Sequence, residues 1–421
     1  MSDERELIFT RRAKGRQVEC SPEKRLNYIE AMAGFFHMLV AILVMLYQAH
    51  GGSENEHGKL AYWIKLLKRN PNTIWDKQRQ LVKDFRSCYE LFDQIGDAYI
   101  VGYIAKTSGW GECKKISETL DAANDIEEQI KLLAKDLGNF NAVHAARKKP
   151  DDERDKVHEN MLLYLQHALI MRNFHHAMRT GDIGRLLLSF RYVTLWFQAS
   201  KQHNYANETI HLTACIEKIW SPEFREFVLD HSLINVTGKP DSFWALDQAN
   251  EHLVWQVKKM MTHNSTPATD LHLREVLSPQ ALYTLLVRIK MAEESDAKTT
   301  TFDYHHQQVE TATDVDIIAK DCLRHDVFTE ILGRSSKEVP DLLIAGLDKL
   351  KSTQALAEYK EKVAKMGIRG VIELQRRAEN ETAESEMMPE LDDDDELRIE
   401  SESVVRHADE DEDTWLDLQE D

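Results

Sequence analysis

The chain has 421 residues, of which 42% are hydrophobic and 30% charged, and its formal net charge is −19. This length can supply the core of two or three domains. Residues from Glu384 onward hold 18 acidic and 2 basic side chains, so about −16 of the charge lies there. The remaining body is nearly neutral. The near-neutral charge of the body excludes a strongly basic surface over the whole protein, but it does not exclude a local basic patch.

Five scattered cysteines and a polar N-terminus indicate a reducing, intracellular location. The cysteines are odd in number and form no Cys-x-x-Cys pair, which argues against a disulfide framework and a thiolate zinc site; they are Cys20, Cys88, Cys113, Cys215 and Cys322. No secretory signal precedes the first helical pattern. A basic run between Arg11 and Arg16 is compatible with a nuclear address or with phosphate contacts.

The predicted elements, taken in chain order, are nearly all helices. After a polar basic arm of residues 1–21, Pro22 opens the first long helix, which Gly51 and Gly52 end. Its segment from Ala31 to Tyr47 is almost wholly apolar, but its length lies at the lower edge of what spans a membrane. A buried core helix is therefore favoured over a membrane helix. Residues 75–106 are predicted to form one or two further long helices.

The middle of the chain combines helical apolar spacing with turn residues. Gly181 is suited to end one helix and Asp182 to cap the next. Ser221 followed by Pro222 fits the start of another helix. Residues 233–236 are expected to be extended, and a last helix starts near Asp241.

Together these patterns predict a mainly α protein, an irregular multi-helix bundle with little or no strand and a disordered acidic tail. The predicted parts are the arm at 1–21, helical parts at 22–145 and 157–292, linkers at 146–156 and 293–313, a C-terminal helical segment at 314–380 and the acidic tail at 381–421.

Signatures of common enzyme classes are absent from the sequence. It contains no P-loop, no dinucleotide-binding Gly-x-Gly-x-x-Gly, no His-Glu-x-x-His and no Gly-x-Ser-x-Gly. What remains is a set of carboxylates. Asp247 and Glu251 are four residues apart and share a helix face, His252 is adjacent, and Asp182 lies upstream. Converging carboxylates could bind divalent ions for phosphodiester cleavage. The alternative is a helix cap at Asp182 and a solvated helix face at Asp247 and Glu251.

Several short segments resemble a fungal family known as domain of unknown function 6589. The similarity runs from about Arg25 to Met291. The segments are Ala33-Gly34-Phe35-Phe36-His37-Met38, Leu66-Leu67-Lys68-Arg69, Gly181-Asp182-Ile183-Gly184-Arg185, Gln202-His203-Asn204-Tyr205, Leu233-Ile234-Asn235-Val236-Thr237-Gly238 and Asp247-Gln248-Ala249-Asn250-Glu251-His252-Leu253.

This resemblance implies an origin in a mobile element, because family members look like parts of transposase-derived genes. Some resemble ribonuclease-H-like transposases, and Asp182, Asp247 and Glu251 are the acidic positions that match the family pattern. The alternating strands of a ribonuclease-H-like core are not visible in the sequence. We therefore expect this copy to be truncated or degenerate relative to an active transposase.

Three functional hypotheses follow from the sequence. The favoured one is a transposon-derived, noncatalytic helical protein that needs no cofactor and binds nucleic acid or protein. The second is a nuclease or transposase that uses divalent metal at Asp182, Asp247 and Glu251. The third is an interaction scaffold whose acidic tail engages basic proteins. None of the three involves a membrane.

Overall fold

The computed structural model describes residues 32–76, 81–107, 140–200, 202–252 and 311–352, together with the single residues 131, 135, 254 and 357. The basic arm at 1–21, the acidic tail at 381–421 and nearly all of the predicted linker at 293–313 lie outside these residues. The chain folds into two compact units. Among the described residues, the larger unit contains those within 34–193 and 221–344, and the smaller one contains those within 1–33, 194–220 and 345–410.

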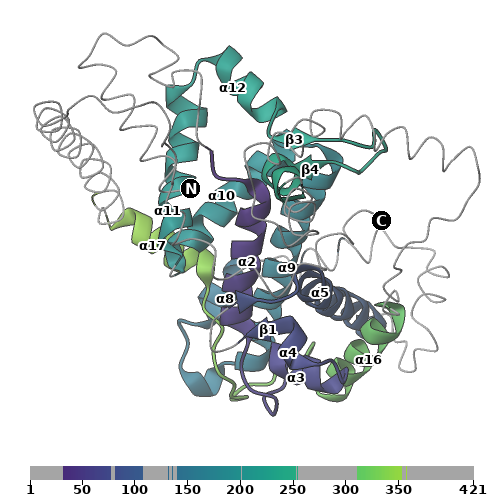
Figure 1. Ribbon diagram of the computed structural model, residues 1–421. Helices are drawn as coiled ribbons and strands as arrows, with labels where there is room; N and C mark the ends of the chain where they lie inside the picture. The colour runs from purple at the N-terminus through teal and green to yellow at the C-terminus, as the bar shows by residue number, and fades with distance from the viewer. Residues whose placement is uncertain are drawn as a thin grey trace, which may run out of the picture. The chain divides into compact units, whose positions relative to one another are not determined.

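Three long helices form the core of the larger unit: α2 (Phe35–His50), α5 (Phe85–Thr107) and α9 (Lys156–Thr180). Both α2 and α5 pack against α9 (Figure 1). Their buried rings interlock, with Phe92 stacked on Tyr164 at a centroid distance of 4.4 Å. Most of the apolar segment predicted to be a core helix forms α2, which is buried along most of its length. The helix starts at Phe35, however, and residues 32–34, which were expected to be helical, are not. Among the described helices, none is both long enough and apolar enough to cross a membrane.

Helix α9 shows how local sequence sets the element boundaries. The Asp155 carboxylate accepts hydrogen bonds from two backbone N–H groups in the first turn. Gly181 ends the helix in the left-handed conformation, with φ of 70°, as predicted from its residue type. Burial tends to raise the pKa of Asp155, but the Arg334 guanidinium and the backbone donors hold it below its ordinary value.

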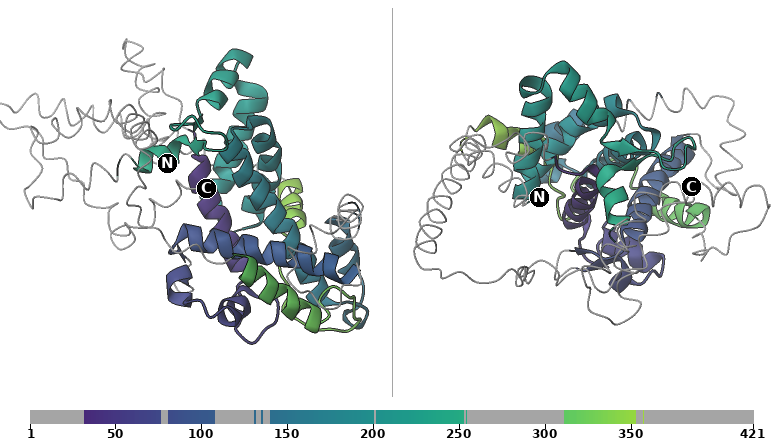
Figure 2. Two further views of the ribbon diagram at one scale, coloured as in Figure 1. Left: turned by 90° about the vertical axis from the view of Figure 1, so that its right-hand side faces the viewer. Right: turned by 45° about the horizontal axis from the view of Figure 1, so that its top comes forward.

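Helix α16 (Thr311–Arg324) lies along α5, although more than 200 residues separate them in sequence. Figure 1 and Figure 2 show the two helices side by side. Gly102 allows this approach, because a Cβ atom there would overlap the ring of Phe328. The segment after α16 is tied to the start of α9 by the ion pair between Arg334 and Asp155, at 2.6 Å.

The sequence interpretation of residues 75–106 was wrong at its beginning. Trp75 and Asp76 form β1, which pairs antiparallel with β2 (Leu81–Val82), and α5 starts only at Phe85. The Trp75 ring packs on Tyr47 of α2 at 5.5 Å. This tertiary contact outweighs the helical apolar spacing from which the longer helix was inferred.

Short elements complete the larger unit. They are α3 (Leu60–Leu66), α4 (Pro71–Ile74), α8 (Phe140–Ala146), the 3-10 turn η1 (Asp151–Glu153), α12 (Pro222–Asp230), β3 (Leu233–Ile234) and β4 (Trp244–Ala245). β3 pairs antiparallel with β4, in agreement with the predicted extended segment. The helix expected near Asp241 begins instead at residue 246, after β4.

The smaller unit contains the end of α10 (Ile183–Ala199) from residue 194 onward, α11 (His203–Ala214), the π-helical turn η2 (Cys215–Ile219) and most of α17 (Leu342–Lys351). Phe197 stacks on Tyr205, and the Gln198 side chain donates to the Ala206 carbonyl oxygen at 2.8 Å. The predicted fold class is confirmed: helices dominate the described residues, and their strands are confined to two two-residue pairs.

Candidate functional site

Asp182 caps a helix, as one of the two sequence interpretations held. Its Oδ1 accepts a hydrogen bond from the Arg185 backbone N–H at 2.9 Å, at the start of α10. Its Oδ2 lies 3.4 Å from the Arg185 guanidinium. That guanidinium also contacts His176 and Thr180, so this family segment joins the end of α9 to the beginning of α10.

Asp247 acts as a cap for a helix more than 200 residues away in sequence. Helix α2 begins after Gly34, whose missing side chain provides no cap. Asp247 accepts hydrogen bonds from the backbone N–H groups of Phe36 and His37, at 3.3 and 2.9 Å. It also accepts from Nδ1 of His37 at 2.8 Å. The carboxylate therefore satisfies N–H groups in the first turn of α2, where negative charge is favourable.

The second ring nitrogen of His37 lies near Glu251. The Nε2 atom of His37 lies 3.6 Å from Oε1 of Glu251, so the imidazole stands between two carboxylates. The hydrogen bond to Asp247 raises the pKa of His37 against the lowering effect of burial, and the charge of Glu251 adds to the rise. Burial alone raises the pKa of Asp247, but His37 and the α2 backbone hold it below its ordinary value.

The three carboxylates of the nuclease hypothesis do not form one ligand set. Asp247 and Glu251 converge on His37, whereas Asp182 binds its own helix terminus. Within the described ranges, the side chains that approach closely enough to hold a metal ion are His57, Asp321 and His325, and they include none of the three.

Other family residues also have identifiable structural contacts. Asn235 closes the loop after β3, because its Oδ1 accepts from the Gly238 backbone N–H at 2.7 Å and Thr237 also contacts it. Gly238 has φ of 71°, which favours glycine. The ring of His252 packs edge-on against Trp244, and burial lowers its pKa. In the smaller unit, His203 begins α11 and Tyr205 stacks on Phe197. Gly184 lies in the first turn of α10.

A basic hollow of about 970 Å³ opens beside α3, and we call it the α3 hollow. Four cationic residues and two acidic ones line it: Lys65, Lys68, Arg69, Lys337, Glu54 and Glu56. Its aromatic lining consists of the partly exposed Trp75 and the buried Tyr47. Lys68 and Arg69 belong to the segment Leu66-Leu67-Lys68-Arg69, for which the sequence suggested no role. The concentration of cations in that segment was the signal that could have pointed to the hollow.

Lys68 occupies a position that normally suits glycine. Just after α3, the Arg69 backbone N–H donates to the Ile64 carbonyl oxygen at 3.0 Å. A helix end of this type places the residue before the donor, here Lys68, in the left-handed region. Lys68 has φ of 54° there and is exposed. Non-glycine residues pay about 1 kcal/mol for this conformation, so the fold tolerates strain to place an ammonium group at the rim of the hollow.

The charges in the α3 hollow are only partly compensated. The Arg69 guanidinium pairs with Asp314 at 2.6 Å and also donates to Gln94, which fixes its position. Lys65 lies 3.6 Å from Glu54, and both side chains are largely exposed. The Lys68 backbone N–H donates to the Lys65 carbonyl oxygen at 3.1 Å, but the Lys68 ammonium group has no hydrogen-bond or ion-pair partner among the residues that the structure describes. The exposed lysines are therefore available to an anionic ligand.

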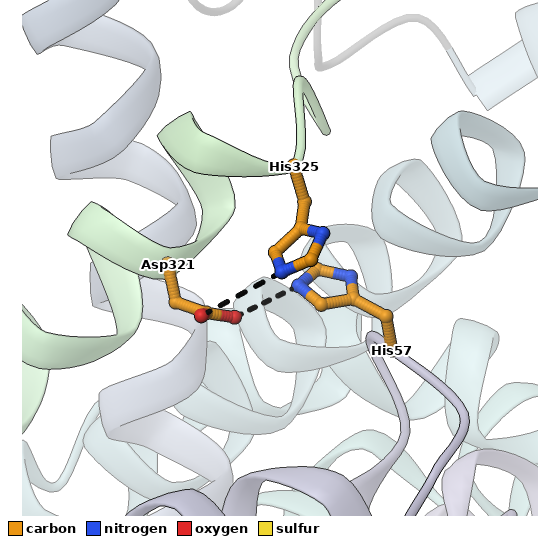
Figure 3. Close-up of side chains that lie close together, drawn as sticks. All are labelled: His57, Asp321 and His325. Carbon is orange, nitrogen blue, oxygen red and sulfur yellow. Dashed lines mark hydrogen bonds and ion pairs between the residues drawn. The ribbon is translucent and has the colours of Figure 1, made fainter.

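A second cluster joins the loop between α2 and α3 to the end of α16 (Figure 3). The Nε2 atom of His57 lies 2.9 Å from Oδ2 of Asp321, and the Tyr62 hydroxyl donates to the same oxygen at 2.9 Å. Burial lowers the pKa of His57 and raises that of Tyr62 to about 12. This cluster could not be foreseen from the sequence. Its one local signal was the four-residue spacing of Asp321 and His325 on a helix.

Comparison with models of known protein families gave a match. The profile of a family of unknown function (DUF6589) matches residues 9–302. The chain belongs to this family. The DUF6589 match contains the α3 hollow lysines 65 and 68, His37, Asp182, Asp247 and Glu251, and it ends before Asp321 and His325. Neither curated proteins nor solved structures gave a match.

Proposed function

We propose that this DUF6589 protein binds single-stranded nucleic acid at the α3 hollow and is itself noncatalytic. The observation that carries the proposal is the grouping of exposed lysines with the partly exposed ring of Trp75 around one concave surface. Proteins that bind single strands combine cations that follow the phosphates with rings on which bases stack. A volume of about 970 Å³ also falls within the range of about 300–1,000 Å³ typical of ligand sites.

The position of Lys68 supports a ligand-binding role over a purely structural one. A glycine in its place would relieve the backbone strain, whereas the lysine adds a cation that contributes no described contact to the fold. Backbone strain of this kind is often found at functional sites. A nucleic-acid ligand also fits the mobile-element origin that the family resemblance implies.

The nuclease alternative has less support. Its mechanism needs the three carboxylates around one or two metal ions. Asp247 instead contributes its charge to the N-terminus of α2, and Asp182 caps α10. Withdrawing Asp247 toward an ion would leave first-turn N–H groups of α2 without their acceptor. We therefore assign these residues to stability.

The binding test uses the full chain and a fluorescently labelled single-stranded oligonucleotide at about 50 mM salt, where phosphate contacts are strong. Lys65→Glu combined with Lys68→Glu is expected to weaken binding about tenfold or more and to make it less salt-dependent. The charge-matched control is Lys148→Glu combined with Lys149→Glu, because both lysines are exposed and lie away from the lining of the hollow. Equal losses in the two double variants, or no binding by the wild type, would refute the proposal.

Lys68→Gly separates binding from stability. Glycine accepts the left-handed conformation, so we expect the free energy of unfolding to stay constant or to rise by about 1 kcal/mol. Oligonucleotide affinity should fall several-fold because one phosphate contact is lost. Thermal unfolding and fluorescence anisotropy on the same samples measure both quantities. An unchanged affinity would remove Lys68 from the site.

The acidic tail supplies a further prediction, although it lies outside the described residues. Its charge is opposite to that of the hollow, and we expect it to compete with nucleic acid in a salt-sensitive manner. Deleting the residues after Glu384 should then raise DNA affinity at low salt. If the affinity stays the same, the tail does not compete for this surface.

A further inference from the structure

The cluster of His57, Asp321 and His325 brings three metal-ligating side chains together from two distant parts of the chain. Figure 3 shows both imidazole rings directed toward the carboxylate of Asp321. One candidate ligand atom from each residue can be chosen so that all of them lie within 4.8 Å of one another. Asp321 and His325 are four residues apart, at the end of α16 and just beyond it, and therefore share one face.

The hydrogen bonds of the cluster leave one imidazole nitrogen poorly satisfied. Oδ2 of Asp321 already accepts from His57 and from Tyr62, both at 2.9 Å. Nε2 of His325 lies 3.8 Å from Oδ1, which is too long for a hydrogen bond. The two rings are nonetheless held 4.3 Å apart at their centroids. A cation between these atoms would satisfy both nitrogens and the carboxylate together.

We infer that His57, Asp321 and His325 form a binding site for a divalent first-row transition-metal ion, with Zn²⁺ the best fit. Two imidazoles and one carboxylate are a donor set that suits Zn²⁺, and three protein ligands leave further coordination positions for water. His325 is 53% exposed, so an ion can enter from solvent.

The surroundings fit this role. Asp321 is buried, and the Tyr62 hydroxyl donates to it and holds its orientation. His57 packs edge-on against Trp63, which restricts its ring. Arg334 adds positive charge near His57, but the Asp155 carboxylate pairs with it at 2.6 Å. Tyr62 and Trp63 lie in α3, next to the loop that carries His57.

A bound ion would join the loop before α3, inside the family match, to α16 outside it. It would thereby stabilise the packing of α16 on α5. This inference is independent of nucleic-acid binding, since no residue of the cluster lines the α3 hollow. Either can fail while the other stands.

The test is a Zn²⁺ titration of the metal-stripped full chain, followed by calorimetry and by the melting temperature. Co²⁺ serves as a second probe, because its visible absorption reports coordination by imidazole and carboxylate. We expect one site per chain that disappears, or weakens at least about tenfold, in His325→Ala. Because His325 is largely exposed, this variant should leave the fold intact. Asp321→Asn, which keeps the shape of the side chain, should have the same effect.

The matched control is His231→Ala, which removes another exposed histidine outside the cluster and should leave the site intact. The wild type and this control should melt at a higher temperature with Zn²⁺, and His325→Ala should not, because an ion bound only by the folded state stabilises it. Absence of Zn²⁺ uptake by the wild type would overturn the inference. So would equal uptake and affinity in His325→Ala and Asp321→Asn.

Discussion

Two histidine–aspartate pairs in the larger unit have nearly the same length but opposite electrostatic character. Nδ1 of His37 lies 2.8 Å from Asp247, and Nε2 of His57 lies 2.9 Å from Asp321. The pKa of His37 is raised, whereas that of His57 is lowered. The distance to a carboxylate therefore does not decide whether an imidazole carries a charge.

The difference comes from what else surrounds each ring. His37 is 41% exposed and has a second carboxylate, Glu251, on its far side. His57 is 17% exposed, and burial is the largest influence on its pKa. The charges of His325 and Arg334 lower the pKa of His57 further. The first pair thus favours a charged imidazole that pairs with Asp247 at the N-terminus of α2, and we call His37 and Asp247 the α2 clamp. The second pair favours a neutral imidazole.

Removing the clamp should have the largest effect. Asp247→Ala deletes the acceptor of two backbone N–H groups of α2 and the partner of His37, so we expect a loss of about 2–4 kcal/mol in the free energy of unfolding. Denaturant unfolding measures it. Asp182→Ala is the comparison, because it removes an exposed cap from α10 and should cost about 1 kcal/mol. Equal losses would show that Asp247 is no more than an ordinary cap.

Gly34→Ala tests the same clamp from the other side. A Cβ atom at Gly34 would overlap the carboxyl group of Asp247, which three hydrogen bonds hold in place. We expect a cost of about 1–3 kcal/mol. In the Asp247→Ala background this cost should shrink, because the carboxyl group is gone and only the Cβ atom of residue 247, at 2.5 Å, still obstructs the new methyl group. Additive losses in the double variant would contradict the assigned contact.

Glu251→Gln should have the smallest effect. Glu251 is 54% exposed and lies 3.6 Å from His37, so its contribution to stability is expected to be within about 0.5 kcal/mol. The pKa of His37 should fall slightly, because one of the charges that raise it is lost. A loss as large as that of Asp247→Ala would mean that the two carboxylates act as one unit.

Much of the fold could be predicted from the sequence, because its signals are local. Gly181, Asp182 and the Ser221-Pro222 pair mark helix ends through their own backbone preferences, and the structure confirms each. The role of Asp247 could not be predicted, since its backbone partners lie more than 200 residues away. The same holds for Asp321, whose partner His57 belongs to another part of the chain. Trp75 was misassigned because the contact with Tyr47 that shapes its strand is also nonlocal.

Histidine titration by NMR, on metal-free protein with signals assigned through His37→Gln and His57→Gln, tests the contrast most directly. A raised pKa means that the contribution of His37 to stability is present below about pH 6.5 and is lost as the pH rises through its folded-state pKa. A lowered pKa means that the contribution of His57 is present above about pH 6.5 and is lost as the pH falls through its folded-state pKa. We predict that the ring signal of His37 titrates above pH 6.5 and that of His57 below it. Titration of both rings at the same pH, or in the reverse order, would contradict the account.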